Sequence, residues 1–357
     1  MKRKNTVRSL RILLIANTPN GTSGIDEYLK CVVRALKQNG TDFKIIYIDT
    51  FFGQKLKDPF RSIFHILSMI YIPILSKVYK ADICHFTVDQ QNFSIPFIAC
   101  KKIVTRHHTK MFDGEFGRYF TFTVKVANKL SVKFADSIIA ISEQTEKELL
   151  ECGRTKNNVT IISRSVPSKF QPNEKLRKNI VFGYIGTITL RKDVHIIVDV
   201  ANEMKTAYPM FIPRFEIYGR GDLSKDVQNK IDVLELSDRV FLMGELNEEI
   251  KVEIYNSFTA FVFPTRFEGF GLPILEAETC GIPVIIKESA EIPSNVSEAC
   301  IKCPDTKSMS AQLHRLATDD LYRTECSMTA LEHSKKFSPA VEDALLIDIY
   351  TSISKNS

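Results

Sequence analysis

The stretch TRFEGFGLPILEAETCGIPVI, residues 265–285, decides how the rest of the chain is interpreted. It begins directly after a short apolar segment, 260–263, which ends at Pro264 and which we predict as a strand. In open α/β sheets, ligands bind in the loops that follow the carboxyl ends of the strands. This loop is therefore predicted to line a ligand site.

A short helix is predicted after the loop, over residues 273–280. Pro273 suits the first position of a helix, and Gly281 suits the position just past its end. Glu268 then lies in the loop, and Glu276 lies about one turn into the helix. The two carboxylates therefore flank the start of the predicted helix.

Phe270, Gly271 and Leu272 form the turn between these glutamates. They are candidate ligand-binding residues through their backbone. The N–H groups of Gly271 and Leu272 are expected to point at a ligand together with the positive end of the helix dipole, which makes an anion site. With a carboxylate for hydroxyl groups on either side, the loop fits a phosphorylated sugar. The alternative is a capped βα unit whose glutamates only favour the helix N-terminus.

Apolar segments separated by helical patterns recur in both halves of the chain, which is typical of parallel sheets covered on both faces. The predicted strands are 10–16, 43–48, 83–86, 103–105, 137–141, 180–185, 214–218, 240–242, 260–263 and 283–286, and the predicted helices include 25–38 and 194–206. We therefore predict the α/β class, with two doubly wound Rossmann-like parallel-sheet domains facing across a cleft.

The passage SRSVPSKFQPNEKLRKN, rich in proline and charge, is interpreted as the interdomain linker. The predicted domains span residues 1–170 and 171–336. A C-terminal helix over 337–357 follows, and it is left open whether this helix crosses back to the first domain.

The composition is that of an ordinary globular protein, with 357 residues, of which 44% are hydrophobic and 25% are charged. Eight cysteines are scattered along the chain, and the close pair Cys300 and Cys303 has no second pair that would complete a zinc set. Free thiols in a reducing compartment are therefore expected.

The two halves of the chain carry net charges of opposite sign. Residues 1–170 contain 27 basic and 14 acidic residues, whereas residues 171–357 contain 21 and 28. A basic half fits nucleic acid, an anionic lipid surface or a phosphorylated substrate. The chain has no zinc-finger, RNA-binding or helix-turn-helix signature, so no nucleic-acid partner is expected.

The most apolar segment, 62–79, is too short to span a membrane and contains Pro73. As a helix it keeps a narrow polar stripe (Ser62, His65, Ser68, Ser76), with basic residues at its ends (Lys55, Lys57, Arg61, Lys77, Lys80). Two interpretations remain open: an interfacial helix, or a helix buried in the core of the first domain. Because the apolar run 10–16 is also too short for a secretory signal, we expect a cytoplasmic protein, with peripheral attachment to the inner face of the plasma membrane.

The segment EGFGLPILEA, followed by GIPVI, resembles the signature of the retaining glycosyltransferases of the GT-B fold, family 4. The resemblance covers nearly the whole chain, is strongest over 180–290 and is weakest over 50–100. Further segments that carry it are VFGYIGTITLRKDVHIIVDVAN, FEIYGRGD, SDRVFLMGELNEEIKVEIYNSFTAFVFPTRFEGFGLP, SGIDEYLKCVVRAL, IVTRHHTK and ADSIIAISEQTEKEL.

The resemblance implies roles for four residues of the second half. Glu276 would bind the ribose hydroxyls of a nucleotide, and Glu268 the hydroxyls of the donor sugar. Arg191 and Lys192 would hold the diphosphate, where cationic donors stabilise the developing charge of a leaving group. One departure is Thr187, which stands where many relatives have an arginine.

In the first half, the resemblance places Gly24 where the chain approaches the phosphates, although Ser23 replaces a second glycine. His107 corresponds to a histidine near the reacting sugar or the acceptor. His108 stands where an aspartate is usual, and for this residue an ordinary surface or core histidine remains the alternative.

The implied activity is a retaining hexosyl transfer from a nucleoside-diphosphate sugar to a glycan or lipid-diphosphate-linked acceptor in surface-polysaccharide assembly. The resemblance makes 1–170 the acceptor-side domain and 171–336 the nucleotide-sugar-binding domain. No Asp-x-Asp occurs in the chain, so neither a metal nor another cofactor is expected. Two alternatives remain open: a non-catalytic nucleotide-sugar-binding subunit of a partner transferase, and a nicotinamide-dependent oxidoreductase. The second is disfavoured because the first βα turn lacks dinucleotide-binding spacing and because Gly219-Arg-Gly221 does not continue to a full GxGxxG.

Overall fold

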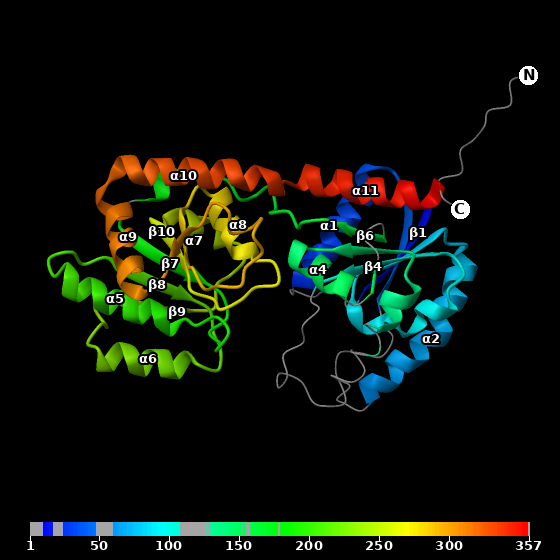
Figure 1. The fold of residues 1–357 in the computed structure, drawn as a ribbon, viewed down its shortest axis with the longest axis horizontal. Helices are drawn as coiled ribbons and strands as arrows, with labels where there is room; N and C mark the ends of the chain where they lie inside the picture. Colours follow the sequence, from blue (N-terminus) through cyan, green and yellow to red (C-terminus); the bar gives the residue numbers. More distant parts are fainter. Residues whose placement is uncertain are drawn as a thin grey trace, which may run out of the picture. The chain divides into compact units, whose positions relative to one another are not determined.

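The computed structural model consists of two compact units. Unit 1 comprises Met1–Ser165 and Ala340–Ser357, and unit 2 comprises Val166–Pro339. Figure 1 shows the elements of each unit. The structure describes residues 10–16, 24–47, 60–107, 126, 129–151, 153–154, 158–177 and 179–355.

Unit 1 is built on a parallel sheet of six strands in the order β2-β1-β3-β4-β5-β6. The strands are β1 (Arg11–Ala16), β2 (Asp42–Tyr47), β3 (Ile83–Phe86), β4 (Lys101–Arg106), β5 (Ser137–Ala140) and β6 (Val159–Ile161). Since β1 pairs with both β2 and β3, the strand order reverses at β1. The carboxyl ends of β1 and β3 therefore form a topological switch point.

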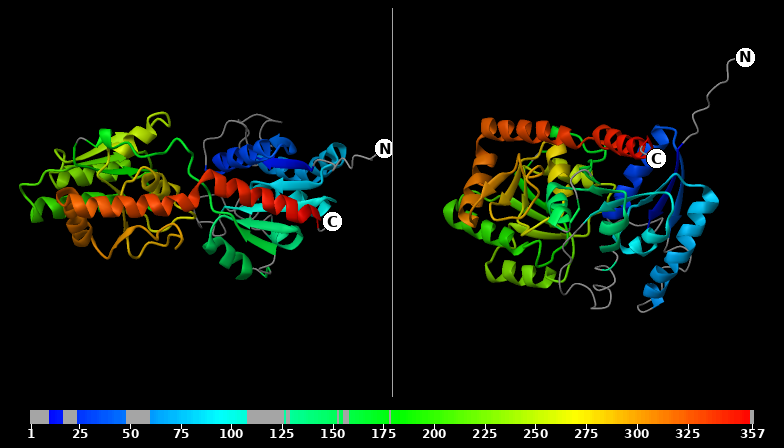
Figure 2. Two further views of the ribbon diagram at one scale, coloured as in Figure 1. Left: turned by 90° about the horizontal axis from the view of Figure 1, so that it is seen from above. Right: turned by 45° about the vertical axis from the view of Figure 1, so that its right-hand side comes forward.

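Helices cover both faces of this sheet (Figures 1 and 2). On one face, α1 (Gly24–Gln38) and α11 (Pro339–Lys355) bury Val32 and Leu346 against the strands. On the other face lie α2 (Phe60–Tyr79), the 3-10 helix η2 (Asp89–Phe97) and α4 (Glu143–Glu151). A sheet buried on both faces explains why its strands read as continuous apolar segments.

Helix α2 buries the side that carries Ser68, Ile72 and Ser76 and exposes an apolar side. Ser68 and Ser76, which belong to the expected polar stripe, are 0% and 4% exposed. In contrast, Ile70, Ile74 and Val78 are 62%, 54% and 74% exposed. Burial of the whole apolar segment in the core, one of the two interpretations left open above, is therefore wrong for these three residues.

The structure describes only part of the polar stripe expected on α2 and of the basic residues at its ends. The side chains of Ser62, His65 and Arg61, together with Lys55 and Lys57, lie outside the part of the chain that the structure describes. Among the described residues, no helix is long and apolar enough to cross a membrane.

Unit 2 contains a second parallel sheet, in the order β12-β11-β10-β7-β8-β9. Its strands are β7 (Val181–Ile185), β8 (Arg214–Tyr218), β9 (Val240–Gly244), β10 (Ala260–Phe263), β11 (Val284–Lys287) and β12 (Ile301–Cys303). The first strand in sequence, β7, lies in the middle, between β8 and β10. Because the strand order reverses between β7 and β10, the loops after these two strands meet at a switch point.

The helices of unit 2 are α5 (His195–Ala207), α6 (Ser224–Val233), α7 (Lys251–Ser257), α8 (Leu272–Thr279), α9 (Thr306–Thr318) and α10 (Asp320–Ser334). Helix α9 packs against α5, and α10 packs against α8. The predicted fold class of two Rossmann-like parallel-sheet units is confirmed. The predicted strands agree within two residues at each end, but the three-residue strands β6 and β12 were not predicted.

Candidate ligand site of unit 2

Two segments meet at the switch point of unit 2: the turn 189–193, which follows β7, and the loop 264–271, which follows β10. The N–H of Arg266 donates to the carbonyl of Arg191 at 2.9 Å. The hydroxyl of Thr265 approaches the same carbonyl at 3.3 Å. These uncharged contacts hold the turn against the loop.

Glu268 lies at the centre of the charged residues of this site. Its Oε1 accepts a hydrogen bond from Arg191 at 3.0 Å, one from the Thr265 hydroxyl at 3.2 Å and a short one from Lys192. Lys192 and Glu268 are largely buried, whereas Arg191 is partly exposed. The structure therefore brings together the three residues that the sequence predicts for the sugar and the diphosphate.

Aromatic rings support both cations. The Nζ of Lys192 lies 4.7 Å from the centroid of the Phe263 ring, and the guanidinium of Arg191 lies 5.3 Å from that of Phe267. Burial lowers the pKa of Lys192, and the charge of Glu268 counteracts only part of this shift. Each cation keeps further N–H donors for a ligand, because a guanidinium has five and an ammonium three.

Glu276 lies about one turn into α8 and is held there by two residues of α7. Its Oε1 accepts a hydrogen bond from Lys251 at 2.9 Å, and its Oε2 accepts one from Tyr255 at 2.8 Å. The pKa of Tyr255 is raised well above its usual value, by burial and then by the charge of Glu276, so the phenol remains a donor. Each carboxylate oxygen retains a second lone pair that a ligand hydroxyl can use.

The backbone at the start of α8 agrees with the predicted anion site. Gly271 has φ 101°, a left-handed conformation that favours glycine. Within the part of unit 2 that the structure describes, the N–H groups of Gly271 and Leu272 have no acceptor. The side chain of Phe270 is buried against the ring of Phe337, so only its backbone is available to a ligand.

Two site residues are predicted in unit 1. His107 lies close to the switch point of that unit, and Gly24 lies at the start of α1. His107 follows β4 and is buried, and its Nε2 donates to the carbonyl of Thr87 at 3.0 Å. Its ring meets the edge of Tyr28 at 5.1 Å between centroids. Gly24 is the first residue of α1, whereas His108 and residues 17–23 lie outside the described residues.

Sequence reasoning missed Lys251 and Tyr255, the partners of Glu276. Their spacing of four places both on one face of α7. The sequence contains that spacing, but an isolated lysine and tyrosine four residues apart carry no specific signal. Asp193 was also missed, although it directly follows Lys192.

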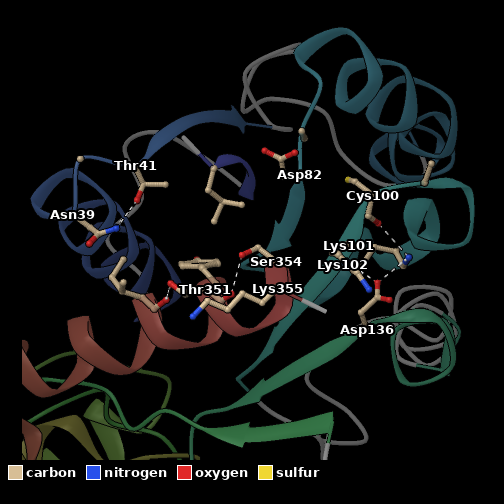
Figure 3. A pocket seen from close by; sticks show the side chains of 16 residues that line it. Asn39, Thr41, Asp82, Cys100, Lys101, Lys102, Asp136, Thr351, Ser354 and Lys355 are labelled. Carbon is tan, nitrogen blue, oxygen red and sulfur yellow. Dashed lines mark hydrogen bonds and ion pairs between the residues drawn. The ribbon is translucent and has the colours of Figure 1, made fainter. Parts of the chain in front are cut away.

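A pocket of about 950 Å³ lies in unit 1. Figure 3 shows the side chains that line it. Leu10, Thr41, Asp82 and Asp136 line it, and each directly precedes a strand of the sheet. The pocket therefore lies at the amino ends of these strands, opposite the edge where ligands bind in open α/β sheets. Among the described residues of both units, no group of three or more His, Cys, Asp or Glu side chains is arranged to hold a metal ion.

Comparisons with known proteins identify the fold. The sucrose-phosphate synthase of Thermosynechococcus elongatus superposes with a TM-score of 0.77 at 15% identity, covering 98% of this chain and 100% of that one. The Anabaena protein HepE in complex with UDP and glucose gives 0.71 at 14% identity, covering 96% and 100%. The chain thus has the GT-B fold.

Sequence comparison finds a match to a known family in the second half of the chain. Residues 165–333 match the family model of the glycosyl transferases group 1. The O-antigen chain mannosyltransferase B of Escherichia coli is 27% identical over 161 residues, which cover 43% of this chain and 41% of that protein. For two further mannosyltransferases, the alignment covers 30% and 46% of the relative's own length.

Proposed function

We propose that this protein is a retaining glycosyltransferase that moves a hexose from a nucleoside-diphosphate sugar to an acceptor in surface-polysaccharide assembly. The observation that carries the proposal is the cluster of Glu268, Arg191 and Lys192 at the switch point of a group 1 glycosyltransferase domain. The mannosyltransferases among its relatives agree with a hexose donor.

The donor is assigned to three parts of the unit 2 site. Arg191, Lys192 and the amides at the start of α8 bind the diphosphate, because they supply cations and a helix N-terminus. Glu268 accepts hydroxyls of the hexose, and Glu276, fixed by Lys251 and Tyr255, accepts the ribose hydroxyls. A solved neighbour that contains UDP supports a nucleotide ligand for this fold.

In the proposed reaction, the bond between the anomeric carbon and the diphosphate oxygen breaks. The bonding electrons pass to the diphosphate, whose growing charge Arg191 and Lys192 stabilise. The acceptor oxygen attacks from the face that the diphosphate leaves, and the departing phosphate takes the acceptor's proton. No metal is required, since buried and half-buried cations perform the charge stabilisation.

For the acceptor we propose a lipid-diphosphate-linked glycan, met by unit 1 at an anionic membrane surface. The exposed apolar residues Ile70, Ile74 and Val78 lie along one side of α2. Lys77 and Lys80, at the end of this helix, are exposed as well. An apolar face beside basic residues matches the chemistry of an anionic lipid interface.

A thermal-shift panel tests the proposed function directly. A sugar nucleotide that binds the folded state should raise the unfolding temperature, because ligand binding stabilises by mass action. The panel contains UDP-, GDP-, TDP- and ADP-sugars, with NADH as the control for an oxidoreductase. Stabilisation by NADH and by none of the sugar nucleotides would overturn the proposal. Binding without transfer to any glycan acceptor would favour the non-catalytic subunit.

A further inference from the structure

Asp193 occupies a backbone conformation that does not suit its residue type. It directly follows Lys192 and has φ 53°, in the left-handed region that favours glycine. Aspartate tolerates this region better than most residues, but the conformation still costs free energy relative to glycine. The carboxylate, however, makes contacts that a glycine at this position could not make.

The carboxylate of Asp193 is buried among cationic groups from other segments. Its Oδ1 accepts from Arg266 at 3.1 Å, and its Oδ2 accepts from Lys287 at 2.6 Å. The ring of His195 approaches Oδ1 at 3.3 Å. Burial alone would raise the pKa of Asp193, but the hydrogen bonds from Arg266 and Lys287 outweigh it and lower the pKa, so the group stays ionised.

Asp193, Arg266 and Lys287 lie at the ends of three neighbouring strands of the unit 2 sheet. Asp193 lies in the turn after β7, Arg266 lies in the loop after β10, and Lys287 is the last residue of β11. The carboxylate thus connects the turn that carries Arg191 and Lys192 to the loop that carries Glu268, two residues beyond Arg266.

We propose that Asp193 is a positioning residue of the donor site, which holds the Arg191–Lys192 turn and the Glu268 loop in the arrangement needed for transfer. This inference rests on the proposed function. Without the carboxylate, the half-exposed guanidinium of Arg266 loses its buried anchor, and the ammonium of Lys287 loses its anion. The loop then gains freedom at the point from which Glu268 extends.

Two substitutions separate the carboxylate from the backbone conformation. Asp193→Gly removes the carboxylate and relieves the left-handed strain, whereas Asp193→Asn keeps the shape and removes the charge. Glu235→Gly is the matched control, because Glu235 is exposed, has φ 51° and lies in the same unit. The control relieves equal strain away from the site.

For both Asp193 variants, we expect kcat to fall about tenfold to a hundredfold, with a smaller change in the donor KM. Glu235→Gly should keep the kinetics of the unaltered protein. In a double-mutant cycle, Asp193→Asn with Arg266→Gln should cost little more than Asp193→Asn alone, because the two groups act through one contact. Unchanged kcat in a variant whose unfolding temperature falls would reduce Asp193 to a structural role and overturn the inference.

A second measurement does not depend on transferase activity. The N–H of Arg266 donates to Arg191 and that of Glu268 donates to the Glu291 carbonyl at 2.9 Å, so both amides report on the loop. In the ligand-free Asp193→Asn variant, hydrogen exchange at these amides should accelerate, while exchange in α5 stays unchanged. Unchanged exchange would overturn the inference even if the protein is a transferase. Acceleration in a protein that binds no sugar nucleotide would instead count against the proposed function.

Discussion

The buried hydroxyl of Tyr255 donates a hydrogen bond of 2.8 Å to Glu276, which lies one turn into the helix that begins at Leu272. Lys251, on the same face of α7, holds the other carboxylate oxygen at 2.9 Å. The carboxylate is therefore oriented before a ligand arrives, and its remaining lone pairs have fixed directions. Such preorganisation is what a site for two neighbouring ribose hydroxyls requires.

Glu276→Ala should weaken nucleotide-sugar binding by about 1.5–3 kcal/mol, the scale of a hydrogen bond to a charged group. Isothermal titration of the sugar nucleotide identified by the thermal-shift panel measures this loss. Tyr255→Phe serves as the comparison, because it keeps the carboxylate and removes one of its two orienting donors. We expect a smaller loss for it. Unaltered affinity in Glu276→Ala would show that the ribose is bound elsewhere.

Arg191→Ala and Lys192→Ala should lower turnover more than they lower donor binding. Negative charge on the diphosphate grows as the glycosidic bond breaks, so cations beside it contribute most in the transition state. Loss of one such donor is expected to reduce kcat about 10²–10³-fold. Steady-state kinetics together with equilibrium binding separate the two effects. Lys225→Ala, at an exposed position of α6, is the control. If kcat and affinity fell equally, these residues would only hold the donor.

Transfer should continue in excess EDTA. In the site described above, the groups that face the expected diphosphate are cations and amides, and the carboxylate of Glu268 is already bound by Arg191 and Lys192. A divalent ion would have to compete with both side chains for Glu268. The measurement is product formation with EDTA and after readdition of manganese or magnesium. Activity that disappears with EDTA and returns with manganese would contradict metal independence.

The strands could be predicted from sequence because continuous apolar segments mark them. Glu268, Arg191 and Lys192 could be predicted because they belong to the segments that carry the family resemblance, in the loops that follow two of these strands. The partners Lys251 and Tyr255 could not be predicted, because their role arises only when α7 packs against α8. The same reason applies to Asp193, whose conformation and cation contacts are created by the fold. For α2, the apolar character could be predicted from sequence, but the side of the helix that faces the core could not.

Unit 2 should become less stable as the pH rises above about 6.5, the ordinary pKa of histidine. Nδ1 of His333 lies 2.7 Å from the fully buried Glu278, while its Nε2 donates to the Asn295 carbonyl at 2.8 Å. Burial alone would lower the pKa of His333, but the contact with Glu278 outweighs it and raises the pKa. Burial raises the pKa of Glu278 despite the histidine.

The pair therefore shares a proton that the folded protein binds more tightly than the unfolded chain. Its stabilising contribution is fully present below the unfolded pKa values and is lost as the pH rises through the raised folded ones. Glu298 pairs with Lys336 at 2.7 Å and also lies 3.7 Å from Nε2 of His333. Lys336 lowers the pKa of Glu298, and burial places the pKa of the Cys300 thiol well above its usual value, so neither group should titrate in this pH range. Hydrogen exchange of α8 amides at pH 6 and pH 8 measures the loss of stability, when the rates are expressed as protection factors, which remove the intrinsic pH dependence of exchange. A pH dependence that persists in His333→Gln would exclude the pair as its source.

Membrane attachment through α2 is the last prediction. Liposome flotation should show binding to anionic vesicles that weakens as salt is raised, because surface electrostatic attraction is screened. The double substitution Ile70→Glu/Ile74→Glu places charges on two exposed positions and should abolish flotation without unfolding unit 1, since neither side chain belongs to the buried core. Leu321→Glu is the matched control, because Leu321 is an exposed leucine of α10 in unit 2. If the unaltered protein stays in solution with anionic vesicles at low salt, the membrane claim fails, and a soluble acceptor becomes the better proposal.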